Sequence, residues 1–365
     1  MLRPSTAPDE EALAAAAAHE RAGNVDQTMQ ICRRVLERGP NFDAQYLLGL
    51  ALMRAGRDAE AKEWIDKAVA IEPGVLNCGQ DALLRQFGRY SPLDSARTRY
   101  EEFKLIAATD GFIISFPKCG RTWVRLLLGK LLQLQFGLPE DGDMLETRAL
   151  TSRITGVPTV DISHDDYPHF KPAAAIERSK ERYRGKTIVL LVRDPRDTIV
   201  SYYFQYVRRG DNRRANDAQF NGTMSEFIRH RIGSIDSLVT FYNVWASQRD
   251  VPQSFHLLRY EDLRQAPVPT LAQLLKYLNM PEIDQRTIER AVAYCSFENM
   301  QRIERGNVLK NIRLATPDTS DPESFKVRRG KVGGYRDYLT PQDIAFIDAR
   351  LALLDDLYAG YKTAT

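Results

Sequence analysis

One short stretch of the chain has the residue types of an anion-binding loop. Residues 112–116 (Phe-Ile-Ile-Ser-Phe) form an apolar run typical of a buried parallel strand. Pro117 ends this run, because proline cannot donate to a sheet ladder. Gly120 then permits a tight turn, and the apolar residues after it recur at helical spacing. The pattern predicts a strand, a loop that holds Lys118, and a helix.

Such a loop can bind a phosphate or a sulfate. The first backbone N–H groups of a helix are unpaired and carry partial positive charge. The ammonium of Lys118 and the hydroxyl of Thr122 would add two donors to these amides. The loop differs from a Walker A loop, because its glycine follows the lysine. An ordinary strand–helix junction with a surface lysine is the alternative interpretation.

Two further strand patterns end in residues that could join the same site. Residues 187–192 are an apolar run that leads into Arg193, and residues 254–258 lead into Tyr260. Ligands of parallel sheets bind beyond the carboxyl ends of the strands. We therefore expect Lys118, Arg193 and Tyr260 on one rim.

Helical patterns separate these strands, for example at residues 271–278 and 286–294. Asp194 and Asp197 are placed to cap the helix that follows Arg193. Alternating strands and helices predict an α/β fold with a P-loop-like parallel sheet that is flanked by helices on both faces. The region 137–172 is rich in turn residues and is expected to be mainly loop.

The N-terminal part of the chain is a different, all-α region. Residues 9–74 repeat with a period of about 33 residues, and the second unit resembles a tetratricopeptide helix hairpin. Small residues at Gly49, Ala61 and Ala68 would let its two helices approach closely. A partner-binding arm and a helical brace that binds nothing both remain open.

Three parts of the chain follow from these patterns. We expect tetratricopeptide-like hairpins over residues 1–75, a helical connector over 76–108 and an α/β domain over 109–365. The connector has helical patterns at 80–87 and 100–108.

A basic segment near the C-terminus is the last informative stretch. Residues 325–335 combine basic side chains with glycines, after a loop rich in Pro and Asp. A flexible segment of this kind can fold over an anionic ligand and bring arginine forks to a phosphate. A solvated run of charges is the alternative.

The composition excludes several classes of protein. The net charge of +3 over 365 residues is too small to argue for nucleic acid. No apolar run reaches the ~18–20 residues of a membrane helix, and residues 14–18 follow acidic residues, unlike a signal peptide. The scattered cysteines indicate neither a disulfide framework nor a zinc site, so we expect a reducing cytoplasm. They are Cys32, Cys78, Cys119 and Cys295.

Together these stretches resemble the sulfotransferases that use 3′-phosphoadenosine 5′-phosphosulfate (PAPS) and release adenosine 3′,5′-bisphosphate (PAP). The first signature of that family, Tyr-Pro-Lys-Ser-Gly-Thr-Thr-Trp, matches residues 116–123, with Cys119 and Arg121 as departures. The resemblance makes Lys118 the catalytic lysine. It implies that the loop and the helix start bind the phosphosulfate and that Trp123 packs near the adenine.

The other signatures extend the resemblance over residues 110–355. Arg193 and Ser201 match the pair that holds the 3′-phosphate in the family. Gly334 and Tyr335 stand where the third signature usually has Asp and Trp. The full set that the resemblance implies for donor binding is Lys118, Cys119, Gly120, Arg121, Thr122, Trp123, Arg193, Ser201, Tyr260, Ser296, Phe297, Met300, Arg328, Arg329 and Gly330.

The general base of the family is a histidine downstream of the lysine. His164, in Ser-His-Asp-Asp and 46 residues after Lys118, is the candidate, and His169 is its rival. A metal site at this His-Asp-Asp cluster is a minor possibility, because three consecutive residues cannot all face one ion.

The resemblance implies transfer of a sulfuryl group from PAPS to an acceptor hydroxyl by in-line displacement. The alternatives are a catalytically inactive helical-repeat scaffold and, with less support, a P-loop kinase. Sugar, phenol, lipid and peptide hydroxyls all remain open as acceptors. An acidic acceptor could be attracted by basic residues at Arg208, Arg209, Arg213 and Arg214.

Overall fold

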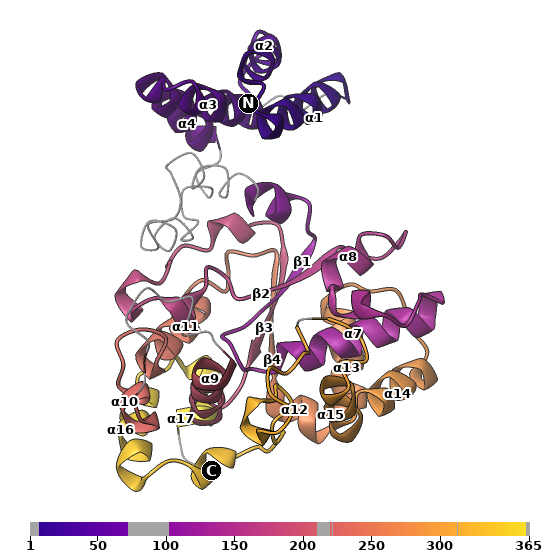
Figure 1. Ribbon diagram of the computed structural model, residues 1–365, viewed down its shortest axis with the longest axis vertical. Coiled ribbons are helices and arrows are strands. Elements are labelled where there is room, and N and C mark those ends of the chain that lie inside the picture. Colours follow the sequence, from indigo (N-terminus) through magenta and orange to yellow (C-terminus); the bar gives the residue numbers. More distant parts are fainter. Residues whose placement is uncertain (1–6, 72–101, 210–219, 221, 312, 363–365) are drawn as a thin grey trace. The chain divides into compact units, whose positions relative to one another are not determined.

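The computed structural model of the chain describes residues 7–71, 102–209, 220, 222–311 and 313–362 (Figure 1). It divides into two compact units, residues 1–107 and residues 108–365. Residues 102–107 are helical. The helix predicted at 80–87 and Cys78 lie outside the described residues.

The first unit contains two helix pairs. Its helices are α1 (Ala7–Ala22), α2 (Val25–Leu36), α3 (Phe42–Arg54) and α4 (Asp58–Ile71). The side chain of Asn41 caps α3 by accepting from the N–H of Ala44 at 2.9 Å. A Cβ at Gly49 would lie 2.6 Å from Cγ1 of Ile65, so the absence of a side chain lets α3 and α4 approach closely.

The second unit is built on a parallel sheet of four strands in the order β2-β1-β3-β4. The strands are β1 (Gly111–Ile114), β2 (Val160–Ser163), β3 (Thr187–Val192) and β4 (Ser254–Arg259). Gly111 pairs with Val160 on one side and with Thr187 on the other. The strands predicted near 112–116, 187–192 and 254–258 are confirmed.

The sequence did not predict one strand of the sheet, β2. It lies within residues 137–172, which were expected to be mainly loop. It is an edge strand of four residues, and only alternate side chains are buried. So short a run between Pro, Gly and Asp residues has no periodicity that distinguishes it from a loop. Its importance is positional, because His164 follows its last residue.

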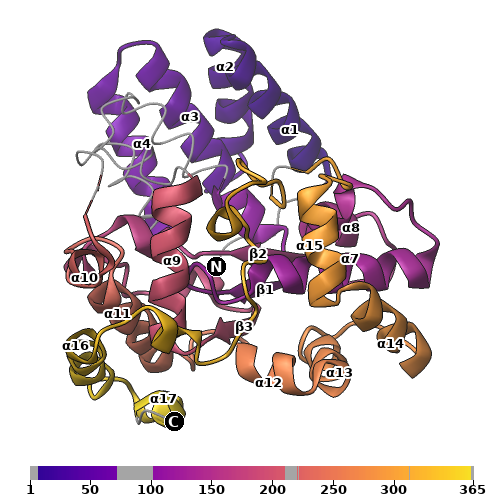
Figure 2. The same ribbon diagram turned by 60° about the horizontal axis from the view of Figure 1, so that its bottom comes forward.

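Helices cover both faces of the sheet, as predicted. Helices α9, α10, α11 and α16 lie on one side of the sheet, and α7, α13, α14 and α15 lie on the other (Figure 1, Figure 2). The described helices of this unit include α7 (Arg121–Phe136), α8 (Thr147–Thr151), α9 (Pro195–Arg209), α10 (Met224–Ile228), α11 (Ile235–Ser247), α12 (Tyr260–Gln265), α13 (Pro267–Tyr277), α14 (Gln285–Tyr294), α15 (Phe297–Arg305), α16 (Pro341–Leu351) and α17 (Ala359–Lys362).

The core of the second unit lies between the sheet and these helices. Every residue of β1 and β3 is buried, as expected for strands covered on both faces. Trp245 on α11 and Tyr183 are fully buried, with ring centroids 5.5 Å apart. No helix in the described part of the chain is both long enough and apolar enough to span a bilayer.

Candidate active site

The loop between β1 and α7 has a strained turn. Lys118 adopts a left-handed backbone with a φ of 72°, and Gly120 follows with a φ of 104°. A Cβ at Gly120 would lie 2.7 Å from the ring of Tyr260, so only glycine fits beside that ring. A left-handed lysine is uncommon, and such residues cluster at functional sites.

A cavity of about 540 Å³ opens beyond the carboxyl ends of the strands, a volume within the usual range for ligand sites. It brings together most of the residues that the sequence singled out. Those that line it are Lys118, Gly120, Arg121, Thr122, Trp123, His164, His169, Arg193, Ser201, Tyr260, Phe297, Met300, Arg328, Arg329 and Gly330.

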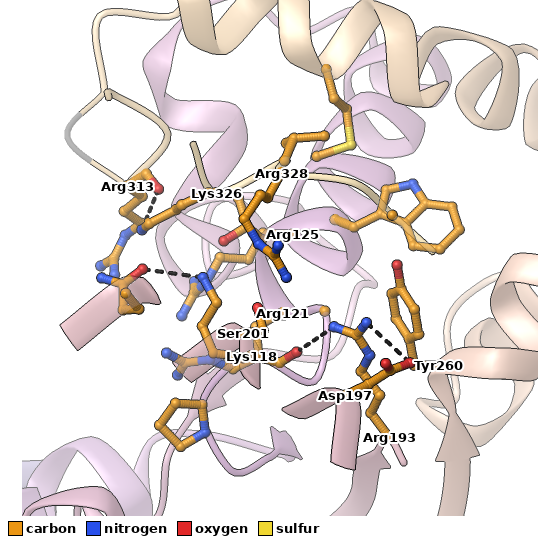
Figure 3. Close-up of a pocket in the computed structure, with 18 of the residues that line it drawn as sticks. Lys118, Arg121, Arg125, Arg193, Asp197, Ser201, Tyr260, Arg313, Lys326 and Arg328 are labelled. Carbon is orange, nitrogen blue, oxygen red and sulfur yellow. Dashed lines mark hydrogen bonds and ion pairs between the residues drawn. The ribbon is translucent and has the colours of Figure 1, made fainter. Parts of the chain in front are cut away.

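Lys118 and Arg193 meet on one rim, as predicted (Figure 3). Nη1 of Arg193 donates to the backbone carbonyl of Lys118 at 3.3 Å. The guanidinium of Arg193 lies 4.5 Å from the ring centroid of Tyr260, within the range of a cation–π contact. Nζ of Lys118 donates to Oε1 of Gln205 on α9 at 3.1 Å. The loop after β1 and the loop after β3 are therefore joined directly.

The basic segment, residues 325–335, is fastened over this cavity by two buried carboxylates. Asp197 on α9 accepts from the backbone N–H groups of Gly333 and Tyr335, both at 2.8 Å. Glu304 on α15 accepts from the backbone N–H of Lys326 at 2.7 Å. Nη2 of Arg193 also donates to the carbonyl of Lys331 at 3.2 Å. Buried carboxylates that accept from backbone amides fix the path of the segment.

Asp197 thus differs from its predicted role as a helix cap. Asp194 alone caps α9, by accepting from the N–H of Arg196 at 2.8 Å. Sequence reasoning missed the amide contacts of Asp197 and Glu304, because their partners lie far away in the sequence.

Arg328 and Gly330 are held by neighbours of the cavity. Arg328 pairs with Glu323 at 2.9 Å and donates to the hydroxyl of Tyr338 at 2.5 Å. Gly330 has a φ of 60°, and a Cβ there would lie 2.8 Å from the ring of Phe297. Arg329 pairs with Asp337 at 3.0 Å.

His164 follows β2 and is oriented by two hydrogen bonds. Its Nδ1 donates to the carbonyl of Ser115 at 2.8 Å. Its Nε2 accepts from the guanidinium of Arg121, which is only a donor. Burial, then the charge of Arg121, then His169 hold the pKa of His164 well below its ordinary value. The imidazole is therefore neutral, and its lone pair is on Nε2, toward the cavity side.

His169 lines the same cavity but has an aromatic environment. It is buried, and its ring lies 4.1 Å from Phe170, 4.8 Å from His164 and 5.7 Å from Tyr202, measured between centroids. The hydroxyl of Tyr202 donates to its carbonyl at 3.3 Å.

The three residues that directly follow His164 form a second strained turn. Asp165, Asp166 and Tyr167 have φ values of 49°, 68° and 49°. The carboxylate of Asp165 pairs with Lys180 and Arg182, and that of Asp166 pairs with Lys171. Both carboxylates are thus used in buried ion pairs. The described residues contain no group of His, Cys, Asp and Glu side chains that could hold a metal ion.

Two of the predicted donor-binding residues do not line the cavity. Cys119 is fully buried, its Sγ lies 3.5 Å from the hydroxyl of Tyr242, and burial raises the pKa of its thiol to about 11. Ser296 caps α15 by accepting from the N–H of Asn299 at 3.2 Å. Each side chain therefore supports the wall of the cavity from outside.

The arginines suggested by the sequence as an acidic-acceptor site have other partners. Arg209 is buried and pairs with Glu304 at 3.1 Å. Arg208 pairs with Asp321 at 3.5 Å, and neither arginine lines the cavity. Arg213 and Arg214 lie outside the described residues. The cavity instead contains Arg125 and Arg313, which sequence reasoning missed, and Lys326, which belongs to the predicted basic segment. Arg125 lies one helical turn after Arg121, and that spacing was the available signal.

In a doubly covered parallel sheet, ligands bind beyond the carboxyl ends of the strands, which is where this basic loop lies. The chain belongs to the sulfotransferase domain family, which matches residues 108–354. This membership identifies the second unit as a sulfotransferase and assigns sulfuryl transfer to it in general terms.

Individual relatives are distant in sequence. The chain is 24% identical over 267 residues to flavonol 3-sulfotransferase of Flaveria bidentis, which covers 66% of this chain and 79% of the relative. It is 24% identical over 292 residues to cytosolic sulfotransferase 17 of Arabidopsis thaliana, and this match covers 74% of this chain and 80% of the relative. The crystal structure of mouse sulfotransferase SULT7A1 complexed with PAP has a TM-score of 0.46 at 18% identity and covers 70% of this chain and 88% of that chain.

Proposed function

We propose that the protein transfers a sulfuryl group from PAPS to an acceptor hydroxyl. The observation that carries this proposal is the contact of Arg193 with the backbone carbonyl of Lys118 at the rim of one cavity. It fixes a guanidinium for a remote phosphate against the backbone of the loop whose lysine would supply an ammonium for the reacting group. Membership of the sulfotransferase family supports the choice of a sulfuryl group over a phosphoryl group.

The donor would be held at both ends by residues of this cavity. Arg193 and Ser201 would bind the 3′-phosphate together with the backbone and guanidinium groups of residues 328–330. The first amides of α7 and the hydroxyl of Thr122 would bind the 5′-phosphosulfate. Cys119 would contribute only its backbone.

Aromatic surface would receive the adenine. Trp123 and Tyr260 have ring centroids 5.9 Å apart, and both line the cavity. Phe297 and Met300 line the same wall, and Ser296 fixes the start of their helix. The glycines at 120 and 330 let the backbone pack directly against the rings of Tyr260 and Phe297, which holds both rings in the cavity wall.

In the transfer step, His164 acts as the base. Once the guanidinium of Arg121 moves off Nε2, this neutral nitrogen would take the proton of the acceptor hydroxyl as the new S–O bond forms and the bond between sulfur and the bridging oxygen breaks. Lys118 would donate to that leaving oxygen, where negative charge builds up, as in phosphoryl transfer. Arg121, already in contact with His164, is placed to donate to the sulfuryl oxygens.

An inactive scaffold is the second candidate, and the departures at Cys119, Arg121 and Gly334 favour it. In this reading Arg121 blocks His164 by occupying its Nε2. An active sulfotransferase and an inactive scaffold can both bind the donor, but only the active enzyme turns it over.

For the chain as a whole, we propose tetratricopeptide-like hairpins over 1–75, a connector over 76–108 and the sulfotransferase domain over 109–365. The close approach of α3 and α4 at Gly49 supports the first part. We propose that this part binds a protein partner. The cytosolic sulfotransferases among the relatives support a cytoplasmic location.

Isothermal titration calorimetry with PAP tests the donor site. Wild-type protein should bind PAP, and Arg193→Gln should weaken binding by about tenfold to a hundredfold, because a charge-assisted contact to phosphate is lost. Ser201→Ala should weaken it less. Arg290→Gln, an exposed change on α14, is the matched control. Unchanged affinity in Arg193→Gln, with melting temperature preserved, would refute the assignment.

A further inference from the structure

The cavity contains a second group of cations that the proposed donor contacts leave unused. We call Arg125, Arg313 and Lys326 the basic cluster. Figure 3 shows Arg313 and Lys326 on the side of the cavity opposite Arg193 and Tyr260. All three cluster residues line the cavity. The cluster therefore faces the half that a donor held at Arg193 and Tyr260 would leave to the acceptor.

Arg125 is the buried member of the cluster. Its guanidinium donates to the carbonyl of Leu145 at 3.3 Å and to the carbonyl of Ile162 at 2.5 Å. Within the part of the chain that the structure describes, no carboxylate forms an ion pair with Arg125 or with its neighbour Arg121. The hydrogen bonds of this buried guanidinium therefore go to neutral carbonyls, and its charge is compensated only in part and without direct contact, by Asp161 and Glu146.

Mutual repulsion adds to this cost. Burial, then Arg313, lower the pKa of Arg125 to about 10. Burial, then Arg125 and Arg313, lower the pKa of Arg121 to about 9. The guanidinium groups of Arg121, Arg125 and Arg313 therefore repel one another, and an anion bound among them would relieve this repulsion.

The two remaining cations and the local carboxylates leave a net positive charge. Nζ of Lys326 donates to the carbonyl of Arg313 at 2.5 Å. Arg313 pairs with Glu146 through two bonds of 2.7 and 2.9 Å. Asp161 is the carboxylate of the cavity lining on this side. Four cations, counting Arg121, therefore face two carboxylates.

The cluster is also next to the reacting position. Arg121 donates to Nε2 of His164, and Arg125 lies one turn further along α7. An acceptor whose hydroxyl meets Nε2 would extend its neighbouring atoms toward Arg125 and Arg313. Resting on the proposed function, we infer that the acceptor carries an anionic group, a carboxylate, phosphate or sulfate, close to the hydroxyl that is sulfated.

Matched acceptor pairs test this inference. Transfer from PAPS is measured for 4-hydroxybenzoate against its methyl ester and for glucose 6-phosphate against glucose, so that carboxylate and phosphate are assayed separately. The anionic member of at least one pair should have a kcat/KM about tenfold higher or more, because it gains a charge-assisted contact. The titration with PAP is run on the same samples.

Variants at Arg313 test whether the basic cluster causes the preference for an anionic acceptor. This side chain is half-exposed, so its replacement should leave the fold intact. Arg313→Gln should reduce the preference for the anionic acceptor by about fivefold or more, and Arg313→Glu should abolish it. Arg290→Gln should leave the preference unchanged. The affinity for PAP should be the same in all four proteins.

The outcomes separate the two proposals. Equal or better transfer to the neutral members would overturn the anionic acceptor while leaving the sulfotransferase activity established. A preference that survives Arg313→Glu would overturn the role of the basic cluster. Absence of PAP binding and of transfer to every compound would instead overturn the proposed function, and the inference with it.

Discussion

Burial and the neighbouring charge of Arg121 together favour the neutral form of His164. The base must be neutral to accept a proton, so activity falls as pH drops through the pKa of His164. That pKa is lowered by burial, then by the charge of Arg121. The acid limb of the pH profile should therefore lie below the ordinary histidine value of about 6.5.

Removing the charge of Arg121 should shift this limb. In Arg121→Met the repulsion of the imidazolium is lost, so the pKa of His164 rises and the acid limb of kcat/KM moves to higher pH. The turnover at the optimum can fall as well, but the readout is the position of the limb. Arg121→Lys keeps the charge and should keep the limb low. An unchanged limb in Arg121→Met would contradict this electrostatic role.

Sequence motifs predicted the residues whose roles depend on local order. Lys118, Arg193 and Ser201 lie in two strand–loop–helix segments, and this local order was enough to predict that they gather beyond the carboxyl ends of β1 and β3. Arg313 was missed, because its position depends on contact with Glu146, far away in the chain. The side chain of Cys119 turns into the core against Tyr242, a direction that a motif match does not reveal.

At the scale of elements, α7 carries the anion-binding loop and must lie close to its neighbours. At Gly129 the backbone of this helix contacts the backbone of Met144, and a Cβ would lie 1.9 Å from the Met144 carbonyl oxygen. Backbone cannot move aside as a flexible side chain does.

Gly129→Ala should therefore destabilise the second unit. Overpacking costs about 1–3 kcal/mol or more, which exceeds the roughly 1 kcal/mol that alanine gains over glycine within a helix. Differential scanning calorimetry should show a melting temperature lowered by several degrees. Gln135→Ala, an exposed change on the same helix, should leave it nearly unchanged. A Gly129→Ala protein at least as stable as wild type would show that the helix can shift freely.

Elements with strong periodicity were predictable, and weak ones were not. β3 is six buried residues, Thr187 followed by five consecutive apolar side chains, and was predicted with the observed bounds. β2 exists because its backbone pairs with β1, and four residues with alternating burial carry too little pattern. The base candidate was therefore predicted from a motif without the strand that positions it.

At the scale of the whole molecule, the net charge of +3 conceals a strong concentration of charge. Ten Lys and Arg residues line the cavity, against Asp161 and Asp197 as its acidic residues. Sequence composition averages over the surface, so it excluded nucleic acid but could not locate this positive site. The folded chain gathers these cations from five separate segments, which suits a donor and an acceptor that are both anionic.

Transfer of radiolabelled sulfate from PAPS to the acceptor panel tests the central claim most directly. Wild-type protein should label at least one acceptor, and Lys118→Met should lower kcat by about 10²–10³, because the leaving oxygen loses its charged donor. Lys276→Met, an exposed lysine on α13, should transfer at the wild-type rate. A wild-type protein that binds PAP but labels none of the acceptors, or a Lys118→Met protein as active as wild type, would contradict the account.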